Sequence, residues 1–133
     1  MRIAVGTDHA GLPLKQHVTQ WLTEHGYEVV DFGVNTPDRV DYPDYVAPAA
    51  RAVASGDCRF GFVFGGSGTG EPIVANKIRG IRCCQATEPE TAALSRQHND
   101  ANMLSMGARI VGEQVAIGCV EAFLAAEFDG GRH

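Results

Sequence analysis

The segment that most constrains the fold is an uninterrupted apolar run at residues 60–64, which leads directly into the glycine-rich residues 65–70. A run of this length without polar alternation is typical of a strand buried on both faces of a parallel sheet. Pro72 follows and suits the first turn of a helix, which we expect to continue to about Lys77. This order of strand, tight loop and helix predicts one unit of an α/β fold.

The rest of the chain alternates between strand and helix patterns. We expect further strands at residues 3–5, 28–32, 81–86 and 103–106, and further helices at 14–22, 44–53, 89–98 and 115–124. Gly26 suits the end of the first helix, and Thr87-Glu88-Pro89-Glu90 resembles a capping box at the start of another. The sequence therefore predicts an α/β fold, a single Rossmann-like three-layer domain over residues 1–133 with a five-stranded parallel sheet.

Composition narrows the class of protein. The chain is 44% hydrophobic and 20% charged with a net charge of -5, which suits a globular protein and argues against a nucleic-acid partner. No apolar run approaches the ~20 residues needed to span a membrane, and a strand pattern begins at once where a signal peptide would stand. The four cysteines lack zinc-ligand spacing, so we expect free thiols, no metal site and a cytoplasmic location.

Polar residues follow several of the predicted strands. Ligands of open parallel sheets bind outside the carboxyl ends of the strands. We expect three polar clusters at this edge: Asp8-His9 after the first strand, residues 67–71 after the third, and His98-Asn99 after the fourth strand's helix.

The glycine-rich loop does not match three familiar motifs. Glu71 stands where a Walker A loop needs lysine, and also where a dinucleotide fingerprint counted from Gly66 needs glycine. Thr69 stands where a nucleophile elbow counted from Gly65 needs glycine, which disfavours a serine hydrolase built on Ser67 and His98. What remains is a glycine-rich strand-to-helix loop that ends in a carboxylate and whose backbone N–H groups could bind an anion.

A carboxylate in this position has two readings. Glu71 could take a proton from a carbon next to a carbonyl while loop N–H groups hold the developing enediolate. It could equally do no more than complement the helix dipole, as Asp8 could be a helix cap and His98 a dipole partner at a helix end. Spacing alone leaves these alternatives open.

Taken together, several segments resemble the ribose-5-phosphate isomerase B and galactose-6-phosphate isomerase family. The matching segments span nearly the whole chain and occur in the family's order: Gly6-Thr7-Asp8-His9-Ala10-Gly11, Asp41-Tyr42-Pro43, Gly66-Ser67-Gly68-Thr69-Gly70-Glu71, Ala75-Asn76-Lys77, Ser95-Arg96-Gln97-His98-Asn99-Asp100, Gly107-Ala108-Arg109 and Gly130-Gly131-Arg132-His133. The resemblance implies a metal-independent aldose-ketose isomerase without cofactor. Its substrate would be D-ribose 5-phosphate, converted to D-ribulose 5-phosphate through a cis-enediolate.

The resemblance also implies roles for individual residues. In one branch of the family the base is a cysteine at the start of the glycine loop, where this chain has Gly65; the other branch uses a glutamate, here Glu71. The remaining expected roles are ring opening by His98 with Asp8, substrate positioning by Ser67, an enediolate cradle of backbone amides at Gly66, Ser67, Gly68, Thr69 and Gly70, anion stabilisation by Asn99, and phosphate binding by His9, Arg109 and Arg132. The family implies a homodimer with active sites at the interface, and dimers that could pair into tetramers.

One departure and two alternatives accompany this reading. The family's tail usually carries another phosphate-binding arginine a few residues after the position of Arg132, whereas the given sequence stops at His133. That difference is compatible with a truncated chain, a weaker phosphate site or another substrate. The alternatives are an isomerase of the same type acting on a hexose or tetrose phosphate, and a non-catalytic phosphosugar-binding module.

Overall fold

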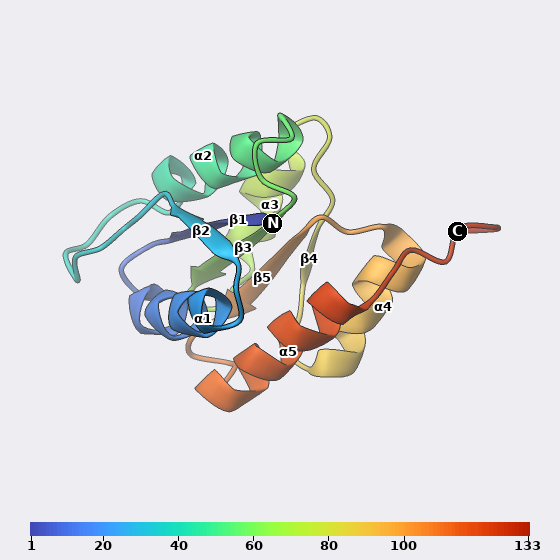
Figure 1. Ribbon diagram of the computed structural model, residues 1–133. Coiled ribbons are helices and arrows are strands. Elements are labelled where there is room, and N and C mark those ends of the chain that lie inside the picture. The colour runs from blue at the N-terminus through green and yellow to red at the C-terminus, as the bar shows by residue number, and fades with distance from the viewer.

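The computed structural model describes residues 1–133, and strands and helices alternate along the chain (Figure 1). In chain order the elements are β1 (Arg2–Thr7), α1 (Leu12–Glu24), β2 (Glu28–Asp31), α2 (Pro43–Ala54), β3 (Phe60–Gly65), α3 (Gly70–Asn76), β4 (Cys83–Gln85), α4 (Pro89–Asn99), β5 (Met103–Gly107) and α5 (Glu113–Ala125). The strands form one parallel sheet in the order β2-β1-β3-β5-β4. This confirms the predicted α/β class and the five-stranded parallel sheet.

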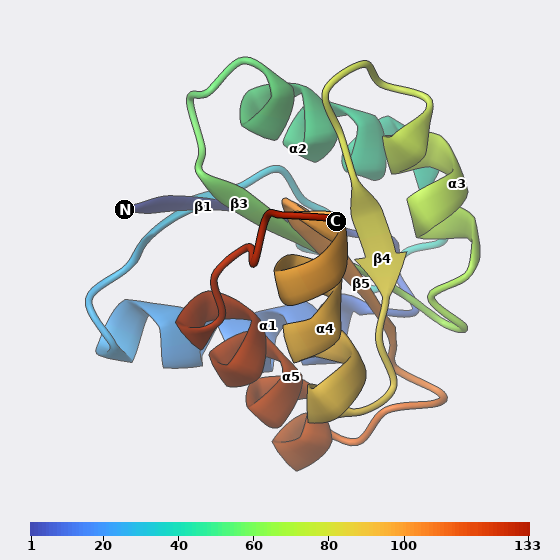
Figure 2. The ribbon, with the colours of Figure 1, turned by 90° about the vertical axis from the view of Figure 1, so that its right-hand side faces the viewer.

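Helices cover both faces of this sheet. Figure 1 shows α2 and α3 above the sheet and α1, α4 and α5 below it, and Figure 2 shows β4 at one edge. Consecutive residues of β3 belong to different halves of the core, because Phe62 packs with the α1, α4 and α5 side and Val63 with the α2 and α3 side. Both are fully buried, as the apolar run at residues 60–64 predicts, and each such side chain stabilises the fold by roughly 1.5–3 kcal/mol.

Two local predictions need correction. The helix after β4 begins at Pro89 with Glu88 as its N-cap residue, and no side chain caps it, so the capping box predicted at residues 87–90 does not form. Instead the Thr91 hydroxyl donates to Glu88 Oε1 at 3.0 Å. The predicted strand at 81–86 is shorter, since β4 spans Cys83–Gln85; Arg82 lies before it and donates its N–H to Asn102 Oδ1 at 2.9 Å. Gly26, with φ +86°, follows the end of α1 as predicted.

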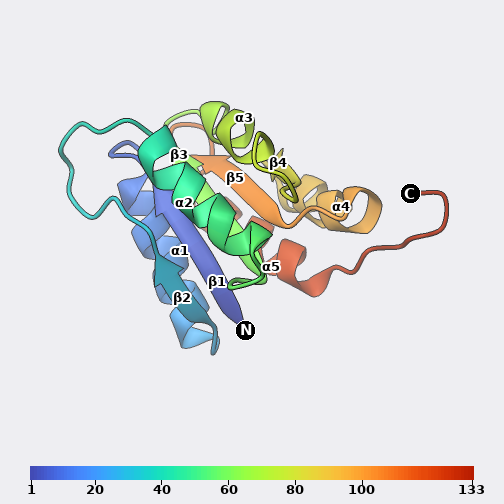
Figure 3. The same ribbon diagram turned by 90° about the horizontal axis from the view of Figure 1, so that it is seen from above.

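The chain ends away from the carboxyl edge of the sheet. Seen from above in Figure 3, the segment after α5 runs outward beyond α4, and the loop between β2 and α2 projects from the opposite side. The carboxyl ends of the central strands therefore face the β2–α2 loop and not the C-terminal tail. None of the helices combines the length and the apolar character that crossing a membrane requires.

Candidate active site

A pocket of about 330 Å³ lies at the carboxyl edge of the sheet, where β1 and β3 end. It is lined by Asp8, His9, Ala10, Tyr42, Gly66, Ser67, Thr69, Gly70, Glu71 and Arg109. Two of the three predicted clusters, Asp8-His9 and residues 67–71, thus share one pocket with Arg109. Sequence reasoning gave Tyr42 no role; the only signal for it was its place in the Asp41-Tyr42-Pro43 segment.

Glu71 lies in the first turn of α3, beneath this pocket. The residue is 3% exposed, and its Oε2 atom is buried without a hydrogen-bond partner. Burial raises the pKa of its carboxyl above the ordinary value; a hydrogen bond to its own backbone N–H lowers it in part, and the charge of Asp8 raises it again. A carboxylate that only complemented the helix dipole would gain nothing from this burial, whereas a base gains proton affinity.

The glycine loop that precedes Glu71 is anchored to the end of β5. Gly68 has φ +78°, and its carbonyl accepts the buried Ser105 hydroxyl at 2.9 Å. A Cβ atom at Gly68 would lie 2.7 Å from the backbone N of Gly107, so only glycine allows the loop to approach β5 this closely. Gly68 thus shapes the loop and does not itself line the pocket. The Ser67 and Thr69 hydroxyls are hydrogen bonded to each other at 2.8 Å.

Asp8, His9 and Arg109 surround the loop on its open side. Asp8 Oδ1 accepts the N–H groups of Ala10 and Gly11 at 3.0 and 3.1 Å, which fixes the carboxylate in the turn that precedes α1. Gly11 is the N-cap residue of α1 and no side chain caps this helix, so the alternative in which Asp8 is a helix cap is wrong. Arg109 donates its backbone N–H to Gly66 O at 2.9 Å, and a Cβ atom at Gly66 would lie 3.2 Å from its Nη1 atom. The guanidinium thus lies beside the loop, with its remaining donors available to an anion.

The third predicted cluster lies elsewhere, and this corrects the expectation that all three meet at one edge. His98 and Asn99 end α4, which runs antiparallel to the strands and so reaches the amino ends of β4 and β5 (Figure 1). The Asn99 carbonyl accepts the Arg82 Nε–H at 2.6 Å, just before β4 begins. Within one chain, His98 therefore lies at the far end of the sheet from Ser67, which removes the serine-histidine pair a hydrolase would need.

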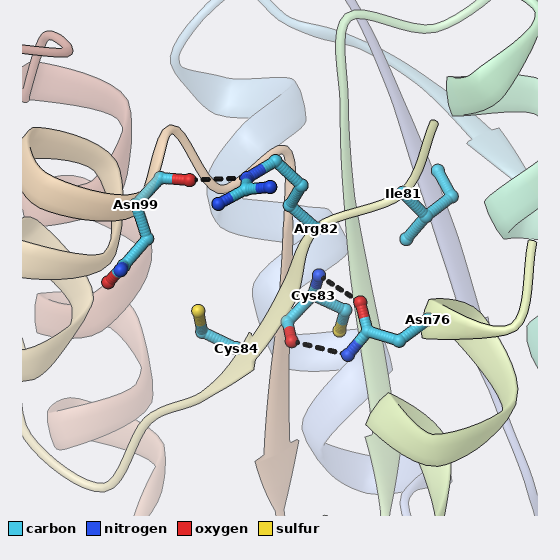
Figure 4. A pocket seen from close by; sticks show the side chains of 6 residues that line it. All are labelled: Asn76, Ile81, Arg82, Cys83, Cys84 and Asn99. Atoms are coloured by element: carbon cyan, nitrogen blue, oxygen red, sulfur yellow. Dashed lines mark hydrogen bonds between the residues drawn. The ribbon is translucent and has the colours of Figure 1, made fainter. Parts of the chain in front are cut away.

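Asn99 lines a second pocket, of about 380 Å³, with Asn76, Ile81, Arg82, Cys83 and Cys84 (Figure 4). The Asn76 amide exchanges two hydrogen bonds with the backbone of Cys83, accepting its N–H at 2.7 Å and donating to its carbonyl at 2.8 Å. Because β4 is an edge strand, this side chain takes the place of a missing neighbour. The contact also ties the end of α3, whose first turn carries Glu71, to the sheet.

The tail brings His133 against His98. The two imidazoles are stacked 4.4 Å apart and 4° from parallel, and His98 Nε2 lies 4.0 Å from Asp129 Oδ2. These three residues form a group whose ligand-type atoms lie within 4.8 Å of one another. Nitrogen lone pairs lie in the plane of each ring, so parallel stacked rings do not direct them at a common ion. Arg132 is exposed next to His133, and the tail that carries it runs outward beyond α4, away from the carboxyl edge of the sheet (Figure 3).

The Glu71 carboxylate leaves no room for a side chain at position 65. A Cβ atom built at Gly65 would overlap Glu71 Oε1. We expect Gly65→Ala to displace the carboxylate and lower kcat on the order of 10²-fold, since small misplacements of a reacting group have effects of this size. The measurement is steady-state turnover of the sugar phosphate substrate proposed below, with Gly112→Ala as control because a Cβ atom there has open space. Equal turnover in both variants would show that the Glu71 carboxylate can move without consequence.

The fold and this pocket define a class: an α/β protein with a buried candidate base and a glycine-rich loop at the carboxyl edge of a parallel sheet. The Ribose/Galactose Isomerase family matches residues 3–133. Ribose-5-phosphate isomerase B of Escherichia coli (strain K12) is 46% identical over 132 residues, which cover 99% of this chain and 89% of the relative.

Two solved structures have closely similar folds. Ribose-5-phosphate isomerase B of Clostridium thermocellum superposes with a TM-score of 0.99 at 47% identity, covering 100% of this chain and 90% of the other. The Mycoplasma genitalium enzyme, described with bound ribulose-5-phosphate, has a TM-score of 0.95 at 38% identity and covers 99% of this chain and 88% of its own. The chain belongs to the ribose/galactose isomerase family, as the sequence motifs predict.

Proposed function

We propose that residues 1–133 form one sugar-phosphate isomerase domain that interconverts D-ribose 5-phosphate and D-ribulose 5-phosphate. The observation that carries the proposal is Glu71, a buried carboxylate with a raised pKa at the end of an anion-binding loop. A pure binding module has no use for such a base, which costs free energy to bury. The relative with bound ribulose-5-phosphate supports the choice of sugar.

Glu71 carries the proton between the two carbons. Its carboxylate takes the proton from C2 of the open-chain aldose phosphate, which places negative charge on the carbonyl oxygen at C1 and gives a cis-enediolate. The same carboxyl then returns the proton to C1, while the C2 oxygen becomes the ketone. Ser67 assists by holding the two oxygens and passing the hydroxyl proton between them. The overlap between a side chain at Gly65 and Glu71 Oε1 supports the glutamate branch of the family for this chain.

Different groups of the protein bind the enediolate and the phosphate of the substrate. Backbone N–H groups of the loop residues that line the pocket, Gly66, Ser67, Thr69 and Gly70, face the enediolate as an oxyanion-binding site, and Gly68 shapes the turn between them. His9 and Arg109 bind the phosphate from within the same chain. Every step is thereby assigned to a side chain or a backbone amide, so the proposed reaction needs neither a metal ion nor a cofactor.

The residues that we propose for ring opening do not all lie in the pocket of a single chain. We assign His98 and Asp8 to proton transfer at the ring oxygen and the sugar hydroxyl, Asn99 to anion stabilisation, and Arg132 to the phosphate. Because His98 and Asn99 lie at the opposite end of the sheet from Glu71, a second copy of the chain supplies them in a homodimer with shared sites. Dimers could pair further into tetramers. The four free thiols suit a reducing cytoplasm, where we place the activity.

The direct test is conversion of D-ribose 5-phosphate to the ketose in the presence of EDTA. Galactose 6-phosphate and allose 6-phosphate are assayed beside it, because the family description covers both ribose and galactose isomerases. We expect fast conversion of the pentose phosphate that EDTA does not reduce. Conversion of a hexose phosphate alone would move the substrate and keep the mechanism, and binding without conversion of any sugar would replace the enzyme by a binding module.

A further inference from the structure

Lys15 is a buried cation to which the proposed chemistry assigns no task. It lies on α1 with 1% of its surface exposed. Its ammonium group donates to Asp31 Oδ1 and Oδ2 at 2.7 and 2.8 Å, to Val34 O at 2.9 Å and to Asn35 Oδ1 at 2.7 Å. Burying an ammonium is costly unless its partners are complete, and such pairs often specify a conformation more than they stabilise a fold.

The acceptors of Lys15 share one short segment, residues 31–35, which leaves β2 at the carboxyl edge of the sheet. Asp31 Oδ1 also accepts the Gly33 N–H at 2.8 Å, so the carboxylate links the ammonium to the turn. The segment is paired with the end of β1: Thr7 donates to Gly33 O at 2.7 Å, and Val34 donates to Thr7 O at 2.9 Å. Lys15 therefore fixes the base of the β2–α2 loop directly beside the residue that precedes Asp8.

The far part of the same loop reaches the pocket. The Val40 N–H donates to His9 Nδ1 at 3.2 Å, and Tyr42 forms part of the pocket wall. A ring nitrogen that accepts a hydrogen bond carries no proton, so a neutral His9 has its proton on Nε2. This tautomer can donate one hydrogen bond to a phosphate oxygen, and the alternative tautomer with a bare Nε2 cannot.

We propose that Lys15 is a positioning residue for phosphate recognition: it fixes the base of the β2–α2 loop so that Val40 holds His9 as the Nε2–H tautomer. This inference rests on the proposed function, in which His9 binds the substrate phosphate. Lys15 touches no substrate atom; it acts through residues 31–35 and the loop that follows them.

The test compares Lys15→Met, which keeps the length of the side chain and removes its charge, with Lys77→Met on the surface. Long-range ¹H–¹⁵N spectra of the imidazole report the His9 tautomer without any enzyme assay. We expect the Nε2–H form in the wild type and in Lys77→Met, and a mixture of tautomers in Lys15→Met. With D-ribose 5-phosphate, KM should rise on the order of tenfold in Lys15→Met, while kcat changes by less than about threefold.

A second variant keeps the proposal testable if Lys15→Met does not fold. Asn35→Ala removes one acceptor from an exposed residue and leaves the Lys15-Asp31 pair intact, and should shift tautomer and KM in the same direction by less. A single Nε2–H tautomer with wild-type KM in every folded variant overturns the role of Lys15, as does a loss confined to melting temperature. Absence of isomerase activity in the wild type would instead overturn the proposed function, while the tautomer spectra would still decide the inference.

Discussion

Glu71→Gln is expected to retain binding of the sugar phosphate and to lose turnover by roughly 10²–10⁴-fold, the range in which general bases contribute. The amide keeps the shape of the side chain in its buried place, but it cannot accept a proton from carbon. The measurement is kcat for D-ribose 5-phosphate, together with the dissociation constant of the substrate measured by calorimetry. A large loss of kcat with a nearly constant dissociation constant identifies Glu71 as the base.

Glu113→Gln provides the matched control for this variant. Glu113 also lies in the first turn of a helix, but its side chain is 59% exposed and it does not line the pocket. We expect its turnover to equal that of the wild type. Wild-type turnover in Glu71→Gln as well would remove Glu71 from the mechanism and return it to a dipole partner of α3.

Glu71→Gln also tests the burial of Glu71 independently of catalysis. The folded-state pKa of this carboxyl is raised above the ordinary value of 4.5, so the folded state disfavours the ionised form. The wild type therefore loses stability as the pH rises from the unfolded-state pKa through the folded-state pKa. We expect Glu71→Gln to have a higher free energy of unfolding than the wild type at pH 7, and this advantage to vanish below about pH 4. Urea denaturation across this pH range measures it.

Mixing two inactive variants is expected to restore activity. In a homodimer with shared sites, Glu71→Gln supplies an intact His98, and His98→Asn supplies an intact Glu71. A heterodimer then has one site with both residues intact and one with neither. Random exchange of equal amounts makes half of all dimers mixed, so about a quarter of the wild-type activity should return.

The experiment uses the two purified variants, exchanged by partial denaturation and refolding together, with turnover of D-ribose 5-phosphate as readout. A mixture of Glu71→Gln with Ser67→Ala is the control, because both of these positions lie in the pocket of one chain. Those two variants cannot complement in a shared site that takes both residues from the same copy. Failure of Glu71→Gln and His98→Asn to complement would show that one chain supplies both residues, against the distance between them in the fold.

The sequence by itself predicted the order of strands and helices, and it placed two of the three polar clusters at the correct edge of the sheet. The unbroken apolar run before the glycine loop is typical of a doubly buried strand, and Phe62 and Val63 face opposite halves of the core as that pattern predicts. Asp8, which directly follows β1, and Glu71, at the end of the loop that follows β3, could be placed at one edge because parallel strands all end there. Local chemistry was enough wherever a residue's position depended only on its own strand.

The tertiary structure alone decided how the remaining residues relate to that edge. His98 and Asn99 end a crossover helix, which runs back to the amino ends of the strands. Although the sequence motifs group these two residues with Glu71, they lie at the opposite end of the sheet. The Lys15 contacts with residues 31–35 and the Val40 contact with His9 join segments whose pairing depends on how α1 packs beside β2. The proton affinity of Glu71 arises in the same way, since burial is a property of the packed chain and local sequence carries no measure of it.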